Sequence, residues 1–208
     1  MAQKLFFFPL KLVAFPGENL NLHIFEPRYK QMIKDCHELD KCFGICTFLD
    51  KLMKYGTEVE LVEIYKTYDD GRMDIKTKGK RPFKILDFHN PLADKLYAGG
   101  KVEFLPLDMT SDRDKNMEFK QRLKEVFQLL QYPVDLSRET INSFTYAHKV
   151  GLKPEQEYEL LILETENKRL EYLIKHFDKI IPLIKEIESA KNKIKMNGHF
   201  KYFDPLNF

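Results

Sequence analysis

The sequence predicts an α+β fold in which strands and one early helix fill about residues 1–109 and helices fill about residues 110–208. Short runs in the first part alternate apolar and polar residues, which is typical of strands. Apolar residues in the second part recur at helical spacing. Strands and helices that occupy separate parts of a chain favour α+β over a doubly wound sheet.

The strands of the first part can be placed in order. Residues 4–15 predict one or two strands divided by Pro9, and residues 20–25 predict another. Pro27 suits a first helical position and predicts a helix that runs to about Leu39. Asp69-Asp70-Gly71 predicts a hairpin turn. Further strands are expected at about residues 43–49, 59–65 and 97–107, and Met73 and Ile75 lead into residues 78–88, which predict another turn and strand.

The second part predicts helices separated by prolines and a glycine. Ser111 with Asp114 fits a capping box before the first helix, and Ser137 is placed to cap the second. Pro154 begins the third. The longest runs from about residue 167 to 196, and Pro182 is expected to kink it.

Composition is typical of a globular protein with an aromatic core. The chain has 208 residues, 43% hydrophobic and 32% charged, with 17 Phe, 10 Tyr and no Trp. Its formal charge of +2 gives no overall attraction to nucleic acid or to a membrane surface. Pro9, Lys11 and Pro16 interrupt the apolar N-terminal run, which argues against a signal peptide. No run reaches the ~18 apolar residues of a membrane span. We expect a cytoplasmic protein.

Three cysteines raise the question of a metal site. Cys42 and Cys46 fall in one expected strand, where their side chains would lie about 13 Å apart, too far to share an ion. Cys36 falls on the apolar face of the expected helix. We therefore expect buried thiols, no metal, no cofactor and, from the odd number of cysteines, a reducing compartment.

Catalytic motifs do not occur in the sequence. None of the serines lies in a Gly-x-Ser-x-Gly elbow. Gly79-Lys80 and Gly99-Gly100-Lys101 lack the hydroxyl residue of a phosphate-binding loop and predict turns instead. The chain is therefore expected not to be an enzyme. A small hydrolase is the weakest alternative, because a nucleophile and a base can meet in space without a sequence motif.

The segment FPGENLNLHIFEPRYKQM, residues 15–32, combines a turn, a strand and a helix start. Glu26 suits the positive end of the helix that Pro27 begins, and Arg28 can pair with it. Tyr29 can pack on the preceding strand. We interpret Glu26, Pro27, Arg28 and Tyr29 as a structural corner that joins this helix to the strands.

The same segment resembles the N-terminal domain of ATP-dependent Lon proteases. The family pattern of Phe-Pro-Leu, a Phe-Pro-Gly turn and Leu-x-Ile-Phe-Glu-x-Arg-Tyr is matched at residues 8–10, 15–17 and 22–29. Phe43-Gly44-Ile45, Gly56-Thr57, Asp70-Gly71-Arg72 and Gly79 follow in the family's order. The likeness is strong to about residue 110 and weaker beyond it. It departs from the family where Pro82 separates Arg81 from Phe83.

The resemblance implies a stand-alone Lon substrate-binding domain of PUA-like type. Residues 1–109 would form a β-barrel of six or so mostly antiparallel strands with one early helix, and residues 110–208 a C-terminal α-helical bundle with one long helix. Its function would be non-catalytic binding of unfolded or tagged polypeptide segments, since neither an ATPase nor a Ser-Lys protease motif occurs in the chain. A separate protease or chaperone partner and a homodimer are left open.

If the chain binds polypeptide, the candidate contact residues are Phe15, His23, Phe25 and Arg28. His23 is the best contact candidate because it alternates with Leu22 and Ile24 and so faces outward if those two face the core. The alternative function is RNA binding, because PUA-like barrels elsewhere bind RNA. It would require a coherent basic face that includes Lys78, Lys80 and Arg81.

Overall fold

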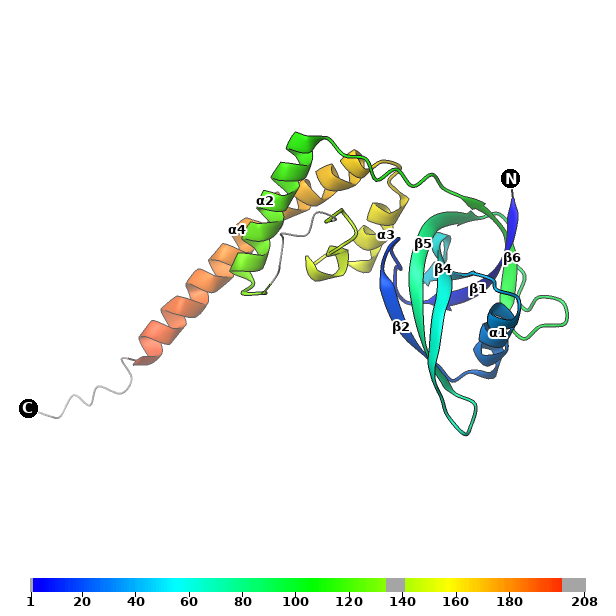
Figure 1. The fold of residues 1–208 in the computed structure, drawn as a ribbon. Coiled ribbons are helices and arrows are strands. Elements are labelled where there is room, and N and C mark those ends of the chain that lie inside the picture. Colours follow the sequence, from blue (N-terminus) through cyan, green and yellow to red (C-terminus); the bar gives the residue numbers. More distant parts are fainter. Residues whose placement is uncertain (1, 134–140, 200–208) are drawn as a thin grey trace, which may run out of the picture. The chain divides into compact units, whose positions relative to one another are not determined.

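The computed structural model describes residues 2–133 and 141–199 (Figure 1). The strands are β1 (Gln3–Leu10), β2 (Asn19–Ile24), β3 (Phe43–Phe48), β4 (Leu52–Thr67), β5 (Met73–Ile85) and β6 (Ala98–Phe104). The helical elements are α1 (Pro27–Glu38), α2 (Arg113–Leu129), the short 3₁₀ helix η1 (Ala147–Lys149), α3 (Pro154–Ile162) and α4 (Glu166–His199). The α+β class expected from the sequence is confirmed.

The six strands form one sheet in the order β2-β5-β4-β3-β1-β6. β1 and β3 are parallel, and the other neighbours are antiparallel. β5 also pairs with β6. It can pair with both β2 and β6 because β2 lies along residues 73–78 and β6 along residues 83–85. The expectation of about six mostly antiparallel strands is therefore confirmed.

The chain forms two compact units, and the division differs from the boundary expected near residue 110. One unit contains residues 1–110 together with 142–166, and the other contains 111–141 together with 167–208. The segment 142–166 belongs to the expected helical part but lies with the strands. Its Tyr158 hydroxyl accepts a hydrogen bond from the backbone N–H of Tyr55 at 3.1 Å, and its Phe144 ring lies 5.1 Å from that of Phe15.

The core of the strand unit is rich in phenylalanine, as the composition predicts. Helix α1 buries one face on the sheet through residues spaced three or four apart, which is the spacing of one helix face. These are Tyr29, Met32, Ile33 and Cys36. A second buried cluster contains Leu5, Phe7, Cys46, Phe83, Ala98 and Val102.

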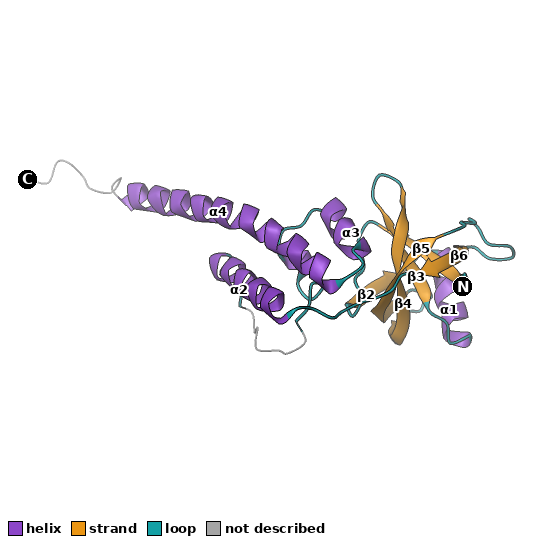
Figure 2. Ribbon diagram, turned by 90° about the horizontal axis from the view of Figure 1, so that it is seen from above, coloured by secondary structure: helices purple, strands orange, loops and turns teal. Residues whose placement is uncertain are grey.

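The second unit is built from α2 and α4, which lie side by side (Figure 2). The buried rings of Phe119 and Phe177 lie 6.0 Å apart, centroid to centroid. An ion pair of 3.0 Å joins Arg122 to Asp178 across the same two helices. None of the helices in the part of the chain that the structure describes has the length and apolar character that a bilayer crossing requires.

Several local expectations were wrong, and two of them concern strands. β1 continues through Pro9, and β5 runs as one strand from Met73 to Ile85, through the expected turn at Gly79-Lys80 and through Pro82. A proline stays within a strand where no ladder hydrogen bond needs its N–H or where the register is irregular, and the β4–β5 register shifts between Glu58 and Val59.

Two expectations about the helices also changed. Asp112, rather than Ser111, is the residue that precedes α2, and the Ser111 hydroxyl accepts a hydrogen bond from the Asn116 side chain at 3.1 Å. Residues 141–150 contain only the 3₁₀ helix η1 in place of the second expected helix. The proposed cap at Ser137 lies outside the described residues.

Candidate functional site

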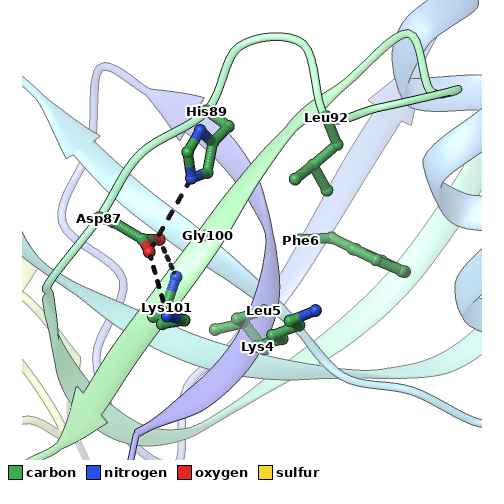
Figure 3. A pocket seen from close by; sticks show the side chains of 8 residues that line it. All are labelled: Lys4, Leu5, Phe6, Asp87, His89, Leu92, Gly100 and Lys101. Atoms are coloured by element: carbon green, nitrogen blue, oxygen red, sulfur yellow. Dashed lines mark hydrogen bonds and ion pairs between the residues drawn. The ribbon is translucent and has the colours of Figure 1, made fainter.

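A pocket of about 290 Å³ opens between β1, β6 and the loop of residues 86–97 (Figure 3). Three apolar side chains line it together with four charged or titratable ones. They are Leu5, Phe6 and Leu92, with Lys4, Asp87, His89 and Lys101, and the backbone of Gly100. In Figure 3, His89 and Leu92 extend from the loop, and Phe6 extends from β1 below them.

The loop of residues 86–97 is tied to helix α1 by three hydrogen bonds. Asp35 accepts one from the Lys95 ammonium at 2.7 Å and one from the Tyr97 hydroxyl at 2.5 Å. The backbone N–H of Leu96 donates to the Gln31 side chain at 2.8 Å. Burial acts to raise the pKa of Asp35, but the bonds from Lys95 and Tyr97 outweigh it and hold that pKa below its usual value. The pocket wall is therefore fixed from the side of α1.

The loop also lies directly on β6, which requires glycine at position 100. A Cβ atom at Gly100 would lie 2.2 Å from the carbonyl oxygen of Asp87 and 2.6 Å from its carboxylate. The expected turn at Gly99-Gly100-Lys101 is therefore wrong, because these residues lie within β6. Two adjacent glycines can indicate a turn or the close approach of another backbone, and here they allow the loop to lie against β6.

Asp87 lies at the centre of the charged side of the pocket. Its carboxylate accepts a hydrogen bond from the backbone N–H of Lys101. The Lys101 ammonium is 4.0 Å from the carboxylate, and the His89 ring nitrogen is 3.9 Å from it (Figure 3). The negative charge of Asp87 is thus already partnered within the protein. Sequence reasoning missed this site, because its residues come from three separate segments.

The expectation that Phe15 contacts a peptide does not agree with its burial. The Phe15 side chain is completely buried, and its ring lies 5.1 Å from Phe144 and 4.9 Å from His148. The segment 142–166 covers the turn that carries it. Phe15 is therefore a core residue and not a candidate for peptide contact.

His23 and Phe25 lie together on the surface beside the β4–β5 hairpin. The His23 ring is 6.1 Å from the Phe25 ring and 5.8 Å from the Tyr68 ring, and its Nδ1 is 2.5 Å from Asp74. Phe25 is 59% exposed. The bond from His23 and then that from the Tyr68 hydroxyl lower the pKa of Asp74. We call His23, Phe25, Tyr68 and Asp74 the aromatic surface cluster.

The corner residues make the contacts expected of them. Pro27 is the first residue of α1, and the Arg28 side chain donates to the Glu26 carboxylate at 2.9 Å. The Arg28 guanidinium lies 4.5 Å from the centre of the Tyr29 ring, which is itself 4.0 Å from the ring of Phe8 on β1. Burial, as the largest effect, raises the pKa of Tyr29. A joining role for this corner fits these contacts and stays a prediction.

Three cations of the basic segment 76–84 pair with acids on β4. Lys76 pairs with Glu63 at 2.8 Å, and Arg81 pairs with Glu58 at 2.7 Å. Lys80 lies 3.4 Å from Glu60. RNA binding would require these cations to face a phosphate backbone. The contacts do not favour that alternative.

The cysteines are free thiols, and two of them are buried. Burial raises the pKa of Cys36 to about 12 and also raises that of Cys46, so both stay protonated at neutral pH. Among the residues that the structure describes, no group of three or more His, Cys, Asp or Glu side chains is arranged to hold a metal ion.

His148 joins the segment 142–166 to the Phe15 turn. Its Nδ1 lies 2.7 Å from Glu157 and its Nε2 lies 3.2 Å from Glu18. The hydrogen bond to Glu157, followed by that to Glu18, raises the pKa of His148 to about 10. Glu18 also accepts the backbone N–H of Phe15 at 2.9 Å. The imidazolium therefore bridges two carboxylates at neutral pH.

We expect this bridge to weaken in alkaline solution. A raised pKa contributes stability that is fully present below the ordinary histidine value of about 6.5 and is lost as pH rises through about 10. The His148 side chain is 35% exposed, so solvent screening should reduce the effect to about 1 kcal/mol. Thermal unfolding of wild type and His148→Gln should differ most near pH 6 and converge above pH 10. A difference that is constant across this range would contradict the prediction.

Comparison with known proteins gives one consistent result. Residues 4–179 match the family described as the ATP-dependent protease La (LON) substrate-binding domain. A LON peptidase N-terminal domain and RING finger protein from Schizosaccharomyces pombe is 31% identical over 114 aligned residues, and the match covers 45% of this chain. The chain spans 23% of that relative's length.

Two solved structures resemble the fold of this chain. A Lon N-terminal domain protein from Xanthomonas campestris has a TM-score of 0.66 at 22% identity, covering 83% of this chain and 98% of its own. The N-terminal domain of a Mycobacterium avium complex Lon protease has a TM-score of 0.64 at 16% identity, covering 85% and 98%.

Proposed function

Because the chain belongs to the family of LON substrate-binding domains, we propose that it binds unfolded or exposed polypeptide segments and catalyses no reaction on them. The observation that carries this proposal is the family match across residues 4–179. A separate protease or chaperone would then act on the bound segment. A cytoplasmic location and a homodimer stay predictions.

We also propose that the sheet is the barrel expected of a PUA-like domain. The pairings run from β5 through β4, β3 and β1 to β6, and β6 pairs again with β5. A circuit of this kind is what a closed barrel requires. β2 lies outside the circuit and is attached to β5.

The position of β2 supports binding of extended polypeptide. Among the described strands, β2 pairs only with β5, so its other edge carries unpaired backbone groups. Gly79 donates to the carbonyl of Glu18, and the Thr77 hydroxyl donates to that of Leu20. Alternation in an antiparallel ladder then directs the N–H and C=O groups of Asn21 and His23 outward. An added strand could bond to them without regard to its sequence.

The aromatic surface cluster lies at the end of this free edge. Phe25 directly follows β2 and exposes more than half of its side chain, and His23 belongs to β2 itself. An apolar side chain of a bound segment would bury surface against Phe25, worth about 25 cal/mol per Å². We therefore propose β2 with Phe25 as the main contact surface. Arg28 lies three positions beyond Phe25 and stays a candidate contact.

The proposal is tested with a permanently unfolded protein. Reduced, carboxymethylated and fluorescently labelled α-lactalbumin should bind with a dissociation constant on the order of 10 μM, about 7 kcal/mol of binding free energy. Native α-lactalbumin should not bind, because its apolar segments are buried. Binding is read from fluorescence anisotropy. No binding of the unfolded form at 100 μM protein would overturn the proposal.

A matched pair of variants locates the surface. Phe25→Ser should weaken binding about tenfold, which corresponds to about 1.4 kcal/mol of lost apolar contact. Leu39→Ser changes a similarly exposed residue, 53% against 59%, at the end of α1, and should leave affinity unchanged. Equal effects of the two variants would remove Phe25 from the contact surface while leaving polypeptide binding itself intact.

A further inference from the structure

The register of β1 and β6 places two lysines opposite each other at the pocket. Lys4 pairs with Lys101 in the antiparallel ladder, so their Cβ atoms lie roughly 5 Å apart on one face. Like charges in directly opposite positions repel and destabilise the pair of strands. Both side chains line the pocket. An anion between the two ammonium groups would remove this repulsion.

The charges already present do not cancel that pair. Asp87 is the one carboxylate among the lining residues, and it is engaged by the backbone and ammonium of Lys101 and by His89. The Lys4 ammonium makes no hydrogen bond or ion pair with any described residue, although the Lys4 backbone belongs to the β1–β6 ladder. With two lysines against one aspartate, the lining has a net positive charge before any contribution from His89. Charge complementarity favours a ligand with a negative group and disfavours one with an ammonium.

The rest of the pocket is suited to an apolar group. Phe6 is half-buried on the same strand face as Lys4, because the two residues are two positions apart on β1. Leu92 of the loop and Leu5 of β1 complete the apolar lining (Figure 3). A volume of about 290 Å³ is at the small end of ligand sites, which span roughly 300–1,000 Å³. One aromatic or branched side chain with one carboxylate suits such a volume.

The pocket is also formed in advance of binding. Its loop is tied to α1 through Asp35 and Gln31, and it contacts the backbone of β6 at Gly100. A ligand would therefore pay little for ordering the wall, and more of its contact energy would appear as affinity.

We propose that this pocket binds an apolar group that carries a carboxylate, with the apolar part against Phe6 and Leu92 and the carboxylate between Lys4 and Lys101. The inference rests on the proposed function in one respect: for a chain that binds polypeptide, the group is a large apolar residue with a carboxylate next to it. Two sources supply this chemistry. One is a C-terminal apolar residue with its free carboxylate, and the other is an internal apolar residue beside an aspartate or glutamate.

The first experiment uses small molecules and needs no polypeptide. N-acetyl-phenylalanine should shift the ¹H–¹⁵N signals of residues 4–6 and 99–101 at millimolar concentration. N-acetyl-phenylalaninamide, which lacks the charge, should bind about tenfold more weakly, and acetate, which lacks the ring, should also bind more weakly. Equal affinity of the acid and the amide, or shifts elsewhere only, would overturn the proposal.

Variants then test the two lysines. Lys4→Gln and Lys101→Gln should each reduce the affinity for the acid severalfold and leave that for the amide unchanged. Lys101→Gln keeps the backbone N–H that bonds Asp87, so the loop should stay in place. Lys11→Gln changes an exposed lysine outside the pocket lining and should have no effect. An equal loss of affinity for the acid and the amide would show that the pocket does not recognise the negative charge of the ligand.

Peptides distinguish the two sources of the carboxylate. An otherwise neutral peptide ending in Phe with a free carboxylate should lose binding on amidation if the C-terminus is the ligand. An amidated peptide with an internal Phe-Asp pair should bind if an acidic neighbour is the ligand. Either result supports the proposal, and binding of neither overturns it for polypeptides.

The outcome also separates this inference from polypeptide binding in general. Unfolded α-lactalbumin that binds equally to wild type and to Lys4→Gln, with no N-acetyl-phenylalanine binding, would overturn the pocket proposal alone. N-acetyl-phenylalanine binding at the pocket without any polypeptide binding would support the pocket and overturn the proposed function.

Discussion

Gly79→Ala is expected to destabilise the strand unit by at least about 3 kcal/mol. A Cβ atom at this position would lie 2.0 Å from the carbonyl oxygen of Phe15 and 3.0 Å from its carbon. Both are backbone atoms, so no side-chain rotation can relieve the overlap. Separating the segments would also stretch two hydrogen bonds, from Gly79 to Glu18 at 2.8 Å and from Gly17 to Gly79 at 2.9 Å.

Urea unfolding followed by near-ultraviolet circular dichroism of the tyrosines measures this effect, because the chain has no tryptophan. Lys78→Ala is the matched control. Lys78 precedes Gly79 in β5 and is exposed, so its replacement should change stability by no more than about 0.5 kcal/mol. A loss below about 1 kcal/mol for Gly79→Ala would mean that the turn and β5 can move apart freely.

Phe83→Ala should cost about 3–5 kcal/mol, the usual range for removing a buried phenylalanine ring. Phe83 is completely buried in β5 and stacks on Phe7 at 6.1 Å. Its ring also fills the space over Gly44 and Gly56, where added Cβ atoms would lie 2.6 and 2.9 Å from it. Removing the ring therefore leaves a cavity lined by backbone that cannot collapse into it.

Phe83→Leu provides the graded comparison, since it keeps part of the volume and should cost less than half as much. The same urea titration reports both variants. If the alanine and leucine variants lose equal stability, cavity formation is not the cause. The slope of the transition should stay near the wild-type value, since neither change alters the surface exposed on unfolding by much.

Local parts of the fold were accessible from the sequence. Pro27 and the spacing of Tyr29, Met32 and Cys36 predicted α1, and the hairpin at residues 69–71 joins β4 to β5 as expected. These features depend on residues that are close in the sequence, so hydrophobic periodicity and turn-forming residues suffice to predict them. The exposure of His23 also followed from alternation along β2.

The remaining features depend on contacts between distant segments. Phe15 was a candidate peptide contact because no residue near it in the sequence covers it. Phe144, from the distant segment 142–166, packs against its ring. Gly79 and Gly100 looked like turns, yet each allows another backbone to approach a continuous strand. The pocket combines β1, β6 and a loop, and neither the opposed Lys4 and Lys101 nor Asp87 can be paired without the register.

The division of the strand unit between residues 1–110 and 142–166 has a consequence for synthesis of the chain. Every strand leaves the ribosome before Phe144 and His148 do. Until then, Phe15 has no aromatic cover and Glu18 lacks the cation that lies 130 positions further along the chain. The nascent sheet would therefore expose part of its own core, and a chaperone that binds such apolar surface would act on this chain during its synthesis.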